Sequence, residues 1–331
     1  MNNIDTNRYL SELLKGKIPP ETKKMILNLD SHGKQAIVDY YNENSDFHQH
    51  ADISNNVYKF GVNTDIHTKI YHYTTFSSLK QILSSKYFRL KPSDLMNDPN
   101  DFRWASKLGK DILADNGANN TEIDKYEGMI NSQPFKDSYV WSFTENGESQ
   151  ALFNVYGNKE GLSLEFDLPD VMRILATHNA HGKESLKDFT DGDAYTFPLK
   201  IEYNKTIQEQ YIKPVVLEWL AAFRSYEKDP IDMKEIMLNC SQNMFLFNMA
   251  FKDPLLYQEE EIRFVVLRIS QLERDPELII RGVPYTICEL TNDLIKSIKI
   301  QTGNSLKINE ASSSIKKLGY NIEILNSALP Y

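Results

Sequence analysis

The sequence contains very little cysteine. Only Cys240 and Cys288 occur in 331 residues, and neither lies in a CxxC or Cys/His spacing. This pattern argues against a disulfide framework and against a zinc site of the usual ligand spacing. We therefore expect no metal, and we expect the reducing environment of the cytoplasm.

Long apolar runs and an excess of positive charge are also missing. No apolar stretch approaches the roughly 18 residues of a membrane span, and the opening MNNIDTNRYL has no basic and then apolar secretion signal. The formal net charge is -9, so no broad positive field is available to hold a phosphate backbone. We expect a soluble protein with no membrane partner, and a sequence-reading DNA binder is disfavoured.

Nucleotide-binding glycine motifs are absent as well. Neither GxGxxG nor GxxxxGK[ST] occurs, so neither a classical dinucleotide fold nor a P-loop is supported. Hydrophobic residues make up 41% and charged residues 25%, as in ordinary globular proteins.

Alternating apolar and polar residues predict a sheet-rich body. In GLSLEFD, for example, Leu162, Leu164 and Phe166 share one face. Such runs predict strands at about 69–73, 87–91, 138–144, 161–167, 196–203, 261–269, 284–290, 296–301 and 321–325. Helices are predicted after a Thr75 cap, over roughly 213–250 with a break near Asp229-Pro230, and over Asn309–Leu318 before a Gly319 stop.

Strands and helices do not alternate strictly, which predicts an α+β fold: a mixed or antiparallel split sheet with flanking helices. We expect two parts. Residues 1–66 form a helical accessory segment that ends in a linker over Asn42–Asp65, and residues 67–331 form an α+β core with a helical insertion around 205–255.

Two polar features lie at either side of the helix that Thr75 caps. His72 lies between Tyr71 and Tyr73, where its ring either binds a sugar hydroxyl or bonds a neighbouring backbone group. Beyond the helix, Asn97-Asp98-Pro99-Asn100-Asp101 is either a plain turn or a rigid lip over a ligand.

Further candidates lie on two later strands. In VWSFT, Trp141 and Phe143 share one face, and a helical run that ends at Tyr156 follows. One of these aromatics stacks on a flat heterocycle, or all of them pack in the core. In YQEEEIRFVV, Glu261 either accepts a ribose hydroxyl and stabilises positive charge on the sugar, or forms only a structural ion pair with Arg263.

As a set these segments resemble a widespread bacterial family catalogued as a domain of unknown function. The matching features are YHYTT with the following helix, NDP, SFT, YG after the next helix, GLSLEFD, the ExExR strand and the terminal S-x-LPY, which together cover about residues 70–331. That family in turn is similar to the ADP-ribosyltransferase fold, in the group with a histidine on the first strand and a glutamate on a late strand.

The second resemblance implies an enzyme that uses NAD as its substrate. His72 would bond the nicotinamide ribose, an aromatic in VWSFT or at Tyr156 would stack on nicotinamide, and Glu261 would support an oxocarbenium-like transition state. The remaining residues expected to contact NAD are Tyr73, Thr74, Asn97, Asp98, Ser142, Phe143, Tyr156 and Arg263. The sequence departs from the pattern because no clear Tyr-Phe/Tyr-Ala element follows the second strand.

Three functions stay open at this point. The first is an NAD-dependent ADP-ribosyltransferase or NAD glycohydrolase, of the kind found among toxins and anti-phage effectors, with a protein or nucleic acid as acceptor. The second is a nucleotide- or nucleic-acid-binding module without chemistry. The third is a module that binds a protein partner through its helical segments. The first requires His72 and Glu261 to face one cleft, roughly 10 Å apart.

Overall fold

The computed structural model describes residues 6–66, 68–96, 100–131, 138–157, 160–179, 194–268 and 278–330. The chain divides into two units, each assembled from three separate stretches. The helical unit comprises Met1–Lys59, Asn100–Pro134 and Glu202–Pro254, and the sheet unit comprises Phe60–Pro99, Phe135–Ile201 and Leu255–Tyr331. The boundaries thus differ from a simple N-terminal segment followed by a core.

The helical unit is built around one long helix, α11 (Lys205–Ser225), against which four others pack. These four are α3 (Ser31–Tyr41), α4 (Asp46–His50), α7 (Trp104–Asp115) and α12 (Pro230–Ala250). The unit also holds α1 (Thr6–Leu13), α2 (Pro20–Asn28), α8 (Asn120–Asn131) and the short η2 (Asp101–Arg103). The predicted break at Asp229-Pro230 is confirmed, because Asp229 caps α12 by accepting from the Ile231 and Asp232 N–H groups.

The stretch expected to be a linker instead contains α4 and α5 (Ile53–Phe60). Ser45 caps α4 by accepting from the His48 N–H at 2.9 Å. Asn56 is buried, and its amide donates to the Asn243 carbonyl oxygen Oδ1 at 2.9 Å. The polar residues that suggested a linker therefore serve as a helix cap and as a partner for buried amide groups.

The sheet unit contains ten strands in the described part of the chain. They are β1 (Lys69–Thr75), β2 (Tyr87–Pro92), β3 (Ser138–Thr144), β4 (Gly161–Asp167), β5 (Ala194–Lys200), β6 (Glu261–Arg268), β7 (Leu278–Ile280), β8 (Val283–Glu289), β9 (Ser297–Ile300) and β10 (Glu323–Asn326). Only β9 and β10 pair in parallel among them; the other pairs are antiparallel. An α+β fold with a mixed sheet is thus confirmed, and β7 is the one strand that the sequence did not predict.

The sheet forks at β3. One edge of β3 pairs with β6 along its whole length, and β5 continues beyond β6. The other edge is shared, because Thr144 pairs with β1 while Val140 and Tyr139 pair with β2. One branch runs β1-β4-β9-β10 and the other runs β2-β8-β7.

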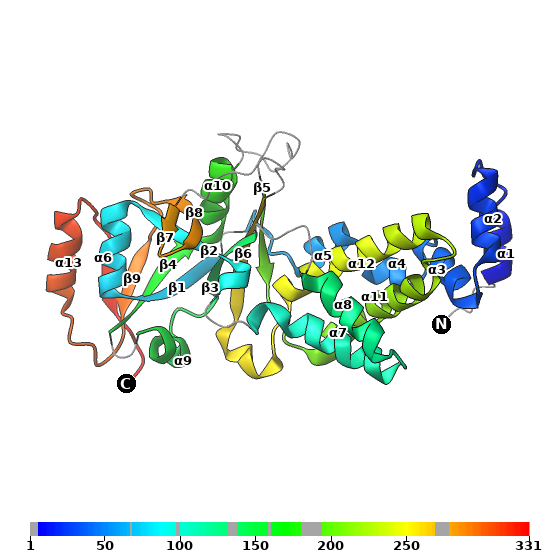
Figure 1. Ribbon diagram of the computed structural model, residues 1–331. Coiled ribbons are helices and arrows are strands. Elements are labelled where there is room, and N and C mark those ends of the chain that lie inside the picture. The colour runs from blue at the N-terminus through cyan, green and yellow to red at the C-terminus, as the bar shows by residue number, and fades with distance from the viewer. Residues whose placement is uncertain are drawn as a thin grey trace. The chain divides into compact units, whose positions relative to one another are not determined.

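The two faces of the sheet are covered differently (Figure 1). The main apolar core includes residues of α6 (Phe76–Ser85), α10 (Leu168–Asn179) and α13 (Ile308–Lys317), and it contains Trp141, Phe143 and Phe166 from the strands. The opposite face meets the short α9 (Gln150–Leu152) and the single π-helical turn η3 (Phe153–Gly157), where Leu152 and Phe153 pack on Tyr73. We call these the core face and the polar face.

Candidate functional site on the polar face of the sheet

A continuous row of side chains crosses the polar face. The register pairs Glu261 with Thr144, Thr144 with Tyr71, Tyr71 with Glu165, and Glu165 with Ser297. Directly paired residues point to the same face, and neighbouring strands lie about 4.8 Å apart. Glu261 and Tyr71 are therefore two strands, or about 10 Å, apart on one surface.

At one end of this row lies an ion pair between Glu261 and Arg263. Arg263 donates from Nε to Oε1 of Glu261 at 3.0 Å and from Nη2 to Oε2 at 2.9 Å. Glu261 is 4% exposed and Arg263 is fully buried. A two-pronged pair of this kind fixes the orientation of the carboxylate, whereas its net contribution to folding is small because both charges lose their hydration.

The backbone directly before Glu261 has an unusual conformation. Glu260 has a φ of 43°, in the left-handed region that residues with a Cβ rarely adopt. Its carbonyl oxygen accepts from the Glu145 N–H at 3.3 Å, which ties the start of β6 to the end of β3. Local strain of this kind is concentrated at functional sites. Glu145 and Glu260 are both exposed, whereas their neighbours in the row, Thr144 and Glu261, are only 2% and 4% exposed.

His72 lies on the other side of the sheet, and the expectation that it shares a cleft with Glu261 is wrong. Its neighbour Tyr71 belongs to the polar row, so alternation turns the His72 ring to the core face. There the ring centroid lies 5.9 Å from that of Trp141 and 5.8 Å from that of Phe143.

The His72 ring has a structural partner. Its Nδ1 donates to the Ser142 carbonyl oxygen at 3.0 Å, since a carbonyl can only accept. Burial lowers the pKa of the ring, and the hydrogen bond to Ser142 opposes that shift only partly. His72 therefore joins β1 to β3 as a neutral imidazole, which is the second of the two interpretations left open by the sequence.

The other expected NAD contacts divide between the two faces. The Phe143 ring lies on the core face, packed against Trp141 and Phe166, so it does not reach the polar face and the expectation that it contacts NAD is wrong. Thr74 lies on the core face, the same face of β1 as His72. Ser142 pairs with Arg263 and therefore lies on the polar face. Tyr156 lies in η3 and is 49% exposed, which leaves it as the accessible aromatic of the set. Asn97 and Asp98 lie outside the described residues.

Tyr73 fixes a turn and is not an open ligand contact. Its hydroxyl donates to the Asn146 carbonyl oxygen at 2.7 Å and accepts from the Ser149 N–H at 2.8 Å. Burial raises the pKa of Tyr73 to about 12, so the hydroxyl stays protonated and can keep donating. A Cβ added at Gly147 would lie 2.5 Å from a ring carbon of Tyr71. The turn Glu145–Ser149 therefore lies directly on the two tyrosines.

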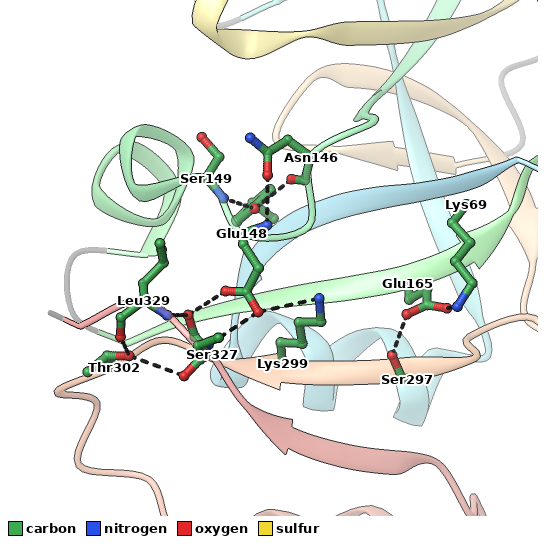
Figure 2. A network of polar contacts seen from close by, with 12 residues as sticks. Lys69, Asn146, Glu148, Ser149, Glu165, Ser297, Lys299, Thr302, Ser327 and Leu329 are labelled. Carbon is green, nitrogen blue, oxygen red and sulfur yellow. Dashed lines mark hydrogen bonds and ion pairs between the residues drawn. The ribbon is translucent and has the colours of Figure 1, made fainter.

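A polar network continues from this turn across the sheet (Figure 2). Glu148 pairs with Lys299 at 3.4 Å, and Lys299 lies 5.3 Å from the centre of the Tyr71 ring. Further along, Glu165 pairs with Lys69 at 2.6 Å and accepts from the Ser297 hydroxyl at 2.9 Å. This network was not predicted from the sequence, although Gly147 between polar residues in TENGES is typical of a close approach of the backbone.

Comparisons with known proteins found no relative of this chain. The chain matches no protein-family model and has no significant match among curated proteins or solved structures. Within the described residues, no group of three or more His, Cys, Asp or Glu side chains could hold a metal ion. No helix in that same part of the chain is both long enough and apolar enough to cross a membrane.

Proposed function

We propose that the sheet unit binds NAD on its polar face and cleaves the bond between nicotinamide and ribose, as an ADP-ribosyltransferase or NAD glycohydrolase. The observation that carries the proposal is the Glu261–Arg263 pair, held almost buried at the start of β6 next to the left-handed Glu260. A carboxylate held in a fixed orientation, beside the exposed Glu260, suits the stabilisation of a developing cationic sugar.

The chemistry asked of Glu261 is electrostatic. As the glycosidic bond breaks, its electron pair leaves with nicotinamide and the ribose becomes oxocarbenium-like; water or an acceptor then bonds to the anomeric carbon and releases a proton. Arg263 is charged at every accessible pH and donates to both carboxylate oxygens of Glu261, which holds the carboxylate in one orientation. A carboxylate near a developing positive charge lowers the barrier without reorganising.

The exposed Tyr156 on η3 is the aromatic that we assign to the nicotinamide ring. Offset stacking on a flat heterocycle needs one accessible ring face, and Tyr156 retains substantial exposure where Phe143 does not. A single π-helical turn is itself a rare element that occurs often at functional sites. The sequence-based form of this hypothesis, in which His72 and Glu261 act on one ribose, is excluded because the His72 ring lies on the core face. The proposal keeps Glu261 alone, and His72 has no catalytic role in it. The forked sheet is compatible with an ADP-ribosyltransferase-like fold, and we place the reaction in the cytoplasm, in a toxin or an anti-phage effector.

The test compares two glutamates that are adjacent in the chain. Purified protein comprising residues 1–331 is incubated with NAD labelled on its adenylate side, and free nicotinamide and label transfer are followed. We expect Glu261→Gln to lower turnover by about 100-fold or more, the usual range for a removed electrostatic contact in a transition state. Glu260→Gln makes the same chemical change on an exposed side chain and should retain turnover.

Two results would overturn the proposal in different ways. Binding of NAD without any nicotinamide release would favour a nucleotide-binding module that lacks the chemistry. Absence of NAD binding would favour a module whose helical segments bind a protein partner. Equal turnover in Glu261→Gln and Glu260→Gln would remove Glu261 from the reaction even if the wild type is active.

A further inference from the structure

The last described residues of the chain form a strap across the polar face, which we define as Ser327–Pro330. The Ser327 N–H donates to the Ile300 carbonyl oxygen at 2.8 Å, so the strap begins where β10 leaves β9. Leu329 then packs, as Tyr71 does, against the cluster of Tyr73, Leu152 and Phe153. The strap therefore touches the helical turns that follow β3.

One carboxylate fastens the strap to the turn Glu145–Ser149. Glu148 accepts from the Ser327 hydroxyl at 2.5 Å through Oε2, and from the Ala328 N–H at 3.3 Å through Oε1. The same Oε1 lies 3.4 Å from Lys299 Nζ on β9 (Figure 2). Glu148 thus joins three parts of the chain: the turn after β3, the strand β9 and the strap.

A second anchor holds the strap independently of Glu148. Thr302, in the loop after β9, donates from its hydroxyl to the Leu329 carbonyl oxygen at 2.6 Å. The Leu329 N–H donates back to the Ser327 hydroxyl at 3.1 Å, which closes the strap on itself. The strap is therefore held from two sides, with the apolar Leu329 side chain against the cluster that includes Phe153 at the start of η3.

We infer that Glu148 is a positioning residue, which clamps the C-terminal strap onto the segment from Glu145 to Gly157 and thereby holds η3 with Tyr156 in place. The relevance of this clamp for NAD rests on the proposed function. The existence of the clamp depends only on the contacts of Glu148, Thr302 and Leu329. Charge-assisted hydrogen bonds to one carboxylate, together with the packing of Leu329, resist local opening of a segment only one helical turn long.

Hydrogen exchange tests the clamp without any assay of activity. In Glu148→Gln one of the two accepting oxygens becomes an NH2 donor, so the contacts with Ser327 and Ala328 cannot both be kept as they are, and the charge opposite Lys299 is lost. We expect amides of residues 150–157 and 328–329 to exchange about tenfold faster, which corresponds to roughly 1.4 kcal/mol of lost protection. Thr302→Val releases the strap from its other anchor and should accelerate the same amides.

The matched control is Glu310→Gln, which makes the same change on an exposed side chain of α13 and should leave exchange unchanged. Unaltered exchange of residues 150–157 in both Glu148→Gln and Thr302→Val would overturn the clamp.

Kinetics with NAD then separate positioning from mere stability. If η3 contacts NAD equally in the ground and transition states, Glu148→Gln should raise KM for NAD about tenfold while kcat changes little. Faster exchange with an unchanged KM would show that the clamp is structural only and would overturn its positioning role. A wild-type protein that releases no nicotinamide would instead overturn the proposed function, and the exchange measurements would still decide whether the clamp exists.

Discussion

The role of His72 is decided by the residues that surround its side chain in the fold. In the sequence it is an imidazole between two tyrosines, a pattern that suits a ligand as well as a core contact. In the fold the ring lies edge-on to Trp141 and bonds the Ser142 carbonyl oxygen on the next strand. Its contribution is to hold β1 against β3, on the face away from Glu261.

This environment predicts a pH dependence of stability. Because burial lowers the His72 pKa below the unfolded value of about 6.5, the unfolded chain binds the proton more readily than the folded chain. The stabilising contribution is therefore complete above about pH 6.5 and declines as the pH falls below that value. We expect the free energy of unfolding of the sheet unit to fall on the order of 1 kcal/mol more between pH 7.5 and 5 in wild type than in His72→Asn.

Trp141 fluorescence, with Trp104 and Trp219 replaced by phenylalanine, reports on the sheet unit during denaturation. The amide of His72→Asn can still donate to Ser142 but does not titrate in this range. His32→Asn, on an exposed side chain, is the control and should keep the wild-type slope. A slope in His72→Asn equal to that of wild type would contradict the assignment.

At the scale of elements, the turn after β3 requires glycine at position 147. Gly147 lies so close to the Tyr71 ring that a Cβ would overlap it, and the Tyr73 hydroxyl fixes the backbone on both sides. We expect Gly147→Ala to cost about 1–3 kcal/mol of stability, the usual effect of forcing an atom into packed space.

A double-mutant cycle measures whether the Tyr71 ring is the cause. In a Tyr71→Ala background the added methyl has room, so Gly147→Ala should cost at least about 1 kcal/mol less there than in wild type. Chemical denaturation of the four proteins gives the coupling directly. Purely additive effects would mean that Gly147 is required for another reason.

The sequence predicted the helices and strands better than it predicted which strands lie side by side. Alternation placed nine strands within a few residues of their observed bounds, and Thr75 and Gly319 mark helix ends as expected. The strand β7 has only three residues, too few for a periodic signal. Alternation also shows which residues of one strand share a face, but only pairing decides which faces of two strands coincide. The expected convergence of His72 and Glu261 failed for that reason.

The candidate site was predictable to a similar extent. Glu261 and Arg263 were recognised as a strand-borne pair, and they do bind each other. The network of Glu148 and Lys299 was missed because its members come from turns and strands far apart in the chain. Long-range polar pairs leave no periodic signal in one sequence.

At the scale of the whole molecule, the N-terminal helices are part of a core. Ile37 and Val38 on α3 are fully buried, and α3 packs on α11 from a distant part of the chain. Removing residues 1–59 should therefore expose apolar surface of α11, and we expect the fragment to aggregate or to lose helix beyond the deleted residues.

Circular dichroism and size-exclusion chromatography check this expectation. Two point variants test the same expectation. Ile37→Ala truncates a buried side chain and should lower the free energy of unfolding by about 2–5 kcal/mol. Leu27→Ala truncates a side chain that is 58% exposed and should lower it far less. A fragment that stays monomeric and keeps the full helical signal per residue would contradict this expectation. Residues 1–59 would then be an accessory segment and not part of the core.

The division of each unit into three stretches also affects how the protein is made. Residues 1–59 leave the ribosome before the later stretches of the helical unit, yet the helices α11 and α12 that complete their core end only at Ala250. At about 5–20 residues per second, the early helices wait roughly 10–40 seconds for those partners. During that interval their apolar faces are natural substrates for chaperones, and a stalled or shortened translation product would be prone to degradation.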